Sequence, residues 1–226
     1  MKQQTQKTKR IALMGILSAL LLLMAFTPIG YLKIGAISIS FLMIPVALGA
    51  IALGPIAGAA LGTLFGITSF AQCFGMDPFG TFLMSINPFF TFVMCIVARA
   101  LAGFLAGLVA NAFRKLSDKK HVNYTQPIDV IGYAVTGLCA ALFNTLLFMG
   151  TLIAFFWHNT EFLAKMEEWG ITTATLGKFL VAFVGINAIL EAVAAFFITG
   201  AIGTALDKAK LIRKFDEKNN SKQEKA

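Results

Sequence analysis

The sequence predicts an all-α integral membrane protein with six transmembrane helices and both termini in the cytoplasm. Three observations support this fold class. The mean hydropathy is +0.78, 58% of the residues are hydrophobic, and six long apolar stretches alternate with more polar segments. We therefore expect a basic cytoplasmic N-terminus over residues 1–10, a six-helix membrane domain over 11–207 and a charged cytoplasmic tail over 208–226.

The six predicted spans follow from the apolar stretches, and the second of them is short. Its 14 residues would extend about 21 Å as a helix, against roughly 30 Å for the hydrocarbon core. We expect this segment to be bent, re-entrant or shielded by protein, with Pro45 as a candidate kink. The stretches cover residues 11–27, 41–54, 56–72, 88–113, 128–157 and 173–206.

Basic residues predict the orientation. They concentrate before the first stretch, between the fourth and fifth, and after the last, and such segments face the cytoplasm. An even number of spans agrees with this, whereas the predicted outer segments 28–40, 73–87 and 158–172 hold only Lys33 and Lys165 as bases. The cytoplasmic group comprises Lys2, Lys7, Lys9, Arg10, Arg114, Lys115, Lys119, Lys120, Lys208, Lys210, Arg213 and Lys214.

Missing motifs argue against several enzyme classes. The chain has no GxxxxGK[ST] phosphate loop, no HExxH metalloprotease motif and no GxSxG nucleophile elbow. Cys73, Cys95 and Cys139 are odd in number and widely spaced, so we expect small packed side chains rather than disulfides or a zinc site. We expect neither enzymatic activity nor a cofactor, metal or nucleic-acid site in this chain.

Four polar residues inside the apolar stretches form the candidate binding site. Arg99 and Asn187 each lie 12 to 14 residues from the outer end of their spans, which is about 18 to 21 Å along a helix. Asn144 lies at a similar depth, and Glu191 follows Asn187 by one turn on the same helix face. A guanidinium with two amides can bind a carboxylate on a polar body.

Each of these residues also has a purely structural interpretation. Arg99 and Glu191 can form an ion pair, because ionisable groups at bilayer depth usually have partners. Both roles can also combine, with Glu191 orienting Arg99 from below. Asn87, before Pro88, is a candidate for ligand contact or for a helix cap. Trp157 is a candidate for ligand stacking or for an interfacial anchor.

Two outer segments are candidates for covering a cavity. Residues 27–35 are rich in turn residues, and the alternation through Ile37, Ile39 and Phe41 predicts a short strand. Residues 73–80 combine glycines with aromatic side chains, which favours an adaptable apolar lid. The charged residues there, Lys33 and Asp77, are expected mainly to face solvent.

Small residues recur along the first span. Ala12, Gly15 and Ala19 follow an i, i+3, i+7 spacing, which allows another helix to approach closely in lipid. The pattern is equally compatible with packing inside this chain and with docking of another protein.

Several segments carry a resemblance to a known family. They are residues 12–19, ALMGILSA; 27–35, TPIGYLKIG; 44–59, IPVALGAIALGPIAGA; and 65–69, FGITS. The chain resembles the substrate-binding S components of energy-coupling factor (ECF) vitamin transporters. Through 72–80, QCFGMDPFG, and 85–89, SINPF, it is most similar to the pantothenate-specific type.

This resemblance implies an S-component-like bundle in the bacterial cell membrane. The subunit would capture a water-soluble vitamin at the outer face and deliver it inward with a transmembrane scaffold subunit and two cytoplasmic ATPases. ATP and Mg²⁺ would act only in those partners. The family docks through small residues on its first helix, normally an AxxxA motif, and Gly15 replaces the first Ala here.

Pantothenate suits the four polar residues, because it carries a carboxylate, an amide and two hydroxyls. Arg99 would bind the carboxylate, while Asn144 and Asn187 would bind the amide or hydroxyls. Alternatives are an S component for folate, riboflavin or a pyridoxine-like vitamin, a self-sufficient channel or secondary carrier, and an assembly protein.

Overall fold

The computed structural model describes residues 2–34, 37–118, 127–171, 173, 175–209 and 211–212. Most of them belong to helices, and two short strands form a hairpin. Of the segments singled out above, the connection over 119–126 and the tail over 213–226 lie outside this part of the chain. In order, the elements are α1 (Lys2–Ala25), β1 (Tyr31–Ile34), β2 (Ile37–Ser40), α2 (Met43–Leu53), α3 (Pro55–Gln72), α4 (Pro78–Ile86), α5 (Pro88–Asp118), α6 (Pro127–Phe156), α7 (Thr160–Glu168) and α8 (Leu176–Lys208).

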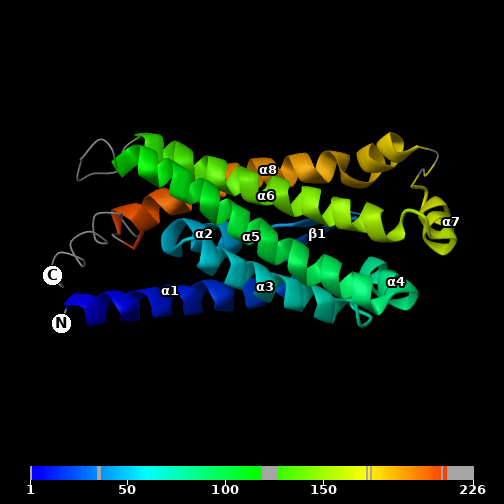
Figure 1. Cartoon of the computed structure of the whole chain (residues 1–226), viewed down its shortest axis with the longest axis horizontal. Coiled ribbons are helices and arrows are strands. Elements are labelled where there is room, and N and C mark those ends of the chain that lie inside the picture. The colour runs from blue at the N-terminus through cyan, green and yellow to red at the C-terminus, as the bar shows by residue number, and fades with distance from the viewer. Residues whose placement is uncertain are drawn as a thin grey trace.

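The long helices run along one axis and form an elongated bundle (Figure 1). The start of α1, the end of α5, the start of α6 and the end of α8 all lie at one end, and α4 and α7 lie at the opposite end. All six predicted stretches therefore contain helix, and the described ends of the chain share one side of the bundle. The helices α4 and α7 were not predicted. They occupy two of the predicted outer segments.

Four of the described helices are long and apolar enough to cross a membrane, judged by length and composition. The corresponding segments are Thr8–Ala25, Pro88–Ser117, Pro127–Phe156 and Asn187–Lys208. The predicted second and third spans, α2 and α3, are not among them. The fold class is thus a helical membrane bundle, with the number of six spans remaining a prediction.

The short helix α2 is shielded by protein, which was one of the three expectations for it. Every residue from Met43 to Ala52 is buried, and the helix contacts α1, α3, α5, α6 and α8. Pro45 does not act as an internal kink, because it lies in the first turn of α2. Backbone N–H groups there have no partner within the helix, so the missing donor of proline costs little.

Glycines bring α3 and α5 into backbone contact. A Cβ atom on Gly58 would lie 2.3 Å from the carbonyl oxygen of Gly103, and one on Gly103 would lie 2.1 Å from that of Gly58. On Gly107 it would lie 2.3 Å from Cα of Pro55. Small residues allow this approach in membrane helices. This contact fixes the position of α5 along α3, and therefore the depth in the bundle at which the polar side chains of α5 lie.

The predicted strand is present and belongs to a hairpin. β1 and β2 pair antiparallel, with Tyr31 opposite Ser40 and Ile34 opposite Ile37. The structure therefore differs from the all-α prediction by this two-stranded hairpin. The hairpin follows α1 and packs against α8 through β2, so it bridges two helices that are far apart in the sequence.

Candidate ligand-binding site

A cavity of about 670 Å³ opens between the helices. Its walls come from the end of α1, the hairpin, the end of α3, the start of α4, and the middle parts of α5, α6 and α8. This volume lies within the range of small-molecule sites. Four predicted residues line it together: Arg99, Asn144, Asn187 and Glu191.

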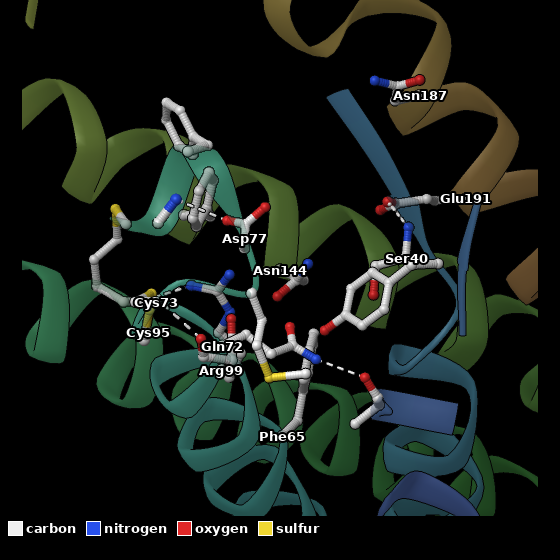
Figure 2. Close-up of a pocket in the computed structure, with 18 of the residues that line it drawn as sticks. Ser40, Phe65, Gln72, Cys73, Asp77, Cys95, Arg99, Asn144, Asn187 and Glu191 are labelled. Carbon is white, nitrogen blue, oxygen red and sulfur yellow. Dashed lines mark hydrogen bonds between the residues drawn. The ribbon is translucent and has the colours of Figure 1, made fainter. Parts of the chain in front are cut away.

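Arg99 is the central cation of the cavity (Figure 2). Its side chain is 7% exposed, and its Nη1 donates to the carbonyl oxygen of Met94 at 2.6 Å. The guanidinium carbon lies 4.5 Å from the ring centre of Phe148 and 5.6 Å from that of Phe65. Aromatic faces attract a cation, so two rings and a carbonyl hold this charge in place.

Arg99 has no anionic partner among the described residues. No carboxylate there lies within ion-pair distance of it, and its buried Nε makes no hydrogen bond. The proposed structural pair with Glu191 is therefore wrong for this structure. An unpaired buried cation is costly, so the cavity is a candidate binding site for an anion.

Two further buried polar atoms lack partners. They are Oδ1 of Asn144, whose side chain is 8% exposed, and Oγ1 of Thr27. Among the described residues, the three buried side-chain atoms without a hydrogen bond all belong to residues that line this one cavity. Buried polar groups in proteins are normally satisfied, so these three atoms mark the cavity as a candidate binding site.

Glu191 bonds to the hairpin. Its Oε1 accepts a hydrogen bond of 2.6 Å from the backbone N–H of Ser40, a residue 151 positions away. Ser40 and Glu191 both line the cavity. Asn187 also lines it and precedes Glu191 on α8 by one helical turn (Figure 2). The carboxylate thus attaches the end of β2 to α8.

Asn87 and Trp157 are not among the residues that line the cavity. Asn87 caps α5, since its Oδ1 accepts from the N–H of Phe90 at 3.1 Å. Trp157 packs against Phe179, with ring centres 5.3 Å apart. The cap interpretation of Asn87 is therefore confirmed, whereas an interfacial anchor role for Trp157 stays a prediction.

Several residues of the cavity wall were not predicted as site residues from the sequence. Gln72 donates from Nε2 to the carbonyl oxygen of Ala25 at 2.5 Å, and burial raises the pKa of the Tyr31 phenol, which keeps it neutral. Asp77 caps α4 through a 2.7 Å bond from the N–H of Gly80 and also lines the cavity. A cap signal, Asp before Pro, was visible in the sequence. Gln72 gave no signal, because a polar residue often ends an apolar stretch.

The small residues of α1 face away from the bundle. Ala12, Gly15 and Ala19 are exposed, and a Cβ atom on Gly15 would meet no atom within 4 Å. Of the two expectations for this spacing, packing inside the chain is wrong. The face is open to lipid or to another protein.

The chain is a helical membrane bundle with a cavity between its helices, and a buried arginine lines that cavity. The model of one family, described as ECF transporter, substrate-specific component, matches residues 9–203. The chain therefore belongs to that family, whose members are transport components rather than enzymes. No curated protein matches the sequence.

Proposed function

We propose that this protein is the substrate-capture subunit of an ECF-type importer and that its substrate is pantothenate. The observation that carries the proposal is the unpaired charge of Arg99 in a cavity whose wall holds two more unpartnered polar atoms. A ligand with one carboxylate and several hydrogen-bonding groups completes such a set. Pantothenate has that composition.

Arg99 suits a carboxylate because of which of its nitrogens is engaged. Nη1 is bound to the carbonyl of Met94, whereas Nε makes no hydrogen bond. The Nε–Nη2 edge of a guanidinium carries two parallel donors that match the two oxygens of a carboxylate. The proposed complex therefore has a bidentate pair on this edge, with the Phe148 ring behind the guanidinium.

The remaining groups of pantothenate face amides and apolar side chains. In this proposal Asn144 and Asn187 bind its amide or hydroxyls, because an amide side chain both donates and accepts. Oδ1 of Asn144 is available as an acceptor. Glu191 and Ser40 close the opposite wall, and Phe65 with Phe148 contacts the apolar carbons.

Delivery to the cytoplasm requires partners that this chain does not encode. We propose a transmembrane scaffold subunit and two cytoplasmic ATPases, with ATP and Mg²⁺ bound only there. The exposed face of Ala12, Gly15 and Ala19 is the proposed docking surface for the scaffold. The proposed location is the bacterial plasma membrane, with both termini inside and the cavity toward the outer face.

Calorimetric titration of the purified protein in detergent tests the substrate. Pantothenate is the test ligand, with riboflavin, folate and pyridoxine as controls. Tight, selective binding of pantothenate supports the proposal. Selective binding of another vitamin keeps the subunit role and replaces the substrate. Binding of none of them by folded protein contradicts the capture function.

A further inference from the structure

The cavity wall contains two thiols in contact. Sγ of Cys73 lies 4.0 Å from Sγ of Cys95, although 22 residues separate them in the sequence. Cys73 follows the end of α3, and Cys95 lies on α5. Both side chains are buried, at 3% and 2% exposure, and both line the cavity. The wide spacing predicted unrelated packing residues, so their meeting is a result of the fold.

The surroundings hold the two sulfurs together. Cys73 Sγ donates weakly to the carbonyl oxygen of Ser69 at 3.3 Å, and it fits against Gly80, where a Cβ atom would lie 2.5 Å from that sulfur. Near Cys95 the backbones of α3 and α5 touch, since a Cβ atom on Gly66 of α3 would lie 2.6 Å from the carbonyl oxygen of Cys95 on α5. Bonding at about 2.05 Å requires the sulfurs to approach by about 2 Å in total.

We propose that Cys73 and Cys95 form a reversible disulfide in the wall of the cavity and that a bound ligand protects them from oxidation. The oxidant is a small peroxide that enters through the cavity. One thiolate attacks hydrogen peroxide and becomes a sulfenic acid, with release of hydroxide that takes up a proton. The second thiol loses its proton, and its thiolate attacks that sulfur and displaces hydroxide, which takes up this proton to give water. Two thiols and one peroxide thus give one disulfide and two waters.

The bond would fix the start of the 73–77 segment to α5. Cys95 precedes Arg99 by four residues, which places both on one face of α5, one turn apart. A ligand bound to Arg99 would therefore lie beside the thiols and cover them from the rest of the cavity. This protection rests on the proposed function, whereas formation of the disulfide does not.

The test is hydrogen peroxide treatment of the whole purified protein, followed by non-reducing peptide mapping by mass spectrometry. The expected product is one intramolecular link between the Cys73 and Cys95 peptides, with loss of two hydrogens and full reversal by dithiothreitol. Cys139→Ser is the matched control and still forms the link, because Cys139 does not line the cavity. Cys73→Ser and Cys95→Ser each abolish it. Sulfinic acid without a link, a link to Cys139, or unchanged thiols would overturn the proposal.

Saturating pantothenate gives the second measurement. If only the empty protein reacts, ligand at about 100 times its Kd slows link formation by up to roughly 100-fold. Unchanged kinetics in protein that binds pantothenate by calorimetry would overturn the protection. Link formation in protein that binds no pantothenate would contradict the proposed substrate alone, so the two failures are distinguishable.

Discussion

Gly62 on α3 lies directly against the backbone of Arg99 on α5. A Cβ atom on Gly62 would be 2.2 Å from the carbonyl oxygen of Arg99, closer than real atoms approach. The helix that carries the cavity's cation is therefore positioned by the absence of a side chain on its neighbour. Ligand affinity and helix packing are coupled at this point.

Gly62→Val should destabilise the bundle and weaken ligand binding. The added side chain forces α3 from α5, and overpacking of this kind costs about 1–3 kcal/mol. Thermal unfolding and pantothenate titration in detergent measure the two effects. Gly150→Val is the matched control, since a Cβ atom there meets nothing within 4 Å. Equal behaviour of the two variants would contradict the coupling.

Arg99→Gln should weaken pantothenate binding by at least about 30-fold, which corresponds to roughly 2 kcal/mol for a lost buried charge contact. Folding should survive, because Arg99 has no ion pair among the described residues. Calorimetry measures the affinity, and thermal unfolding measures the stability. Arg99→Lys should bind with intermediate affinity, since it keeps the charge and loses the planar fork. Retained affinity in an unstable Arg99→Gln protein would assign Arg99 a structural role.

Asn144→Ala should lower affinity by about fivefold, the value of one neutral hydrogen bond of roughly 1 kcal/mol. It should change stability little, because Oδ1 of Asn144 has no hydrogen-bond partner among the described residues. Titration and thermal unfolding of the same sample separate the two effects. A large loss of stability with unchanged affinity would contradict a ligand contact.

Glu191→Ala should release the hairpin from α8. The 2.6 Å hydrogen bond from Ser40 N–H disappears, so hydrogen exchange at Ser40 should speed up. Glu191→Gln is the matched control, because its amide oxygen still accepts this bond. Amide exchange followed by mass spectrometry of peptides that cover β2 measures the effect. Equally slow exchange in both variants would show that other contacts hold the hairpin.

Gly15→Leu should leave pantothenate binding intact and prevent docking of the scaffold subunit. Gly15 faces outward, and a larger side chain there touches nothing in this chain. Co-purification with a co-expressed scaffold and ATPases measures docking. Gly150→Leu, on an exposed position of α6, should co-purify normally. Retained scaffold in the Gly15 variant would remove this face as the docking surface.

Much of the fold could be predicted from sequence because lipid imposes long apolar helices. Apolar length located the six helical segments, and alternation located β2. The helices α4 and α7 were missed, since nine-residue helices produce little periodicity. Their caps at Asp77 and Asn159 were the available signals.

The cavity was predictable only in part. Depth along each helix selected Arg99, Asn144 and Asn187, which the structure brings to one cavity. Helix rotation and loop placement follow no such rule. An ion pair with Arg99 was therefore one of the alternatives for Glu191, and its hydrogen bond with Ser40 was not predicted. The same limit separated Cys73 from Cys95, whose contact depends on the close approach of α3 and α5.

In the proposed function, the bound vitamin would also stabilise the fold, because it would supply partners to the unpartnered polar atoms of the cavity. A carboxylate that neutralises Arg99 removes a cost that the empty bundle carries, and ligand at about 100 times its Kd adds roughly 2.7 kcal/mol to the folded state. That amount is a large share of the stability of an ordinary domain. In the proposed function, cells starved of the vitamin would accordingly hold this subunit in its least stable form, so that supply would set its lifetime as well as its occupancy.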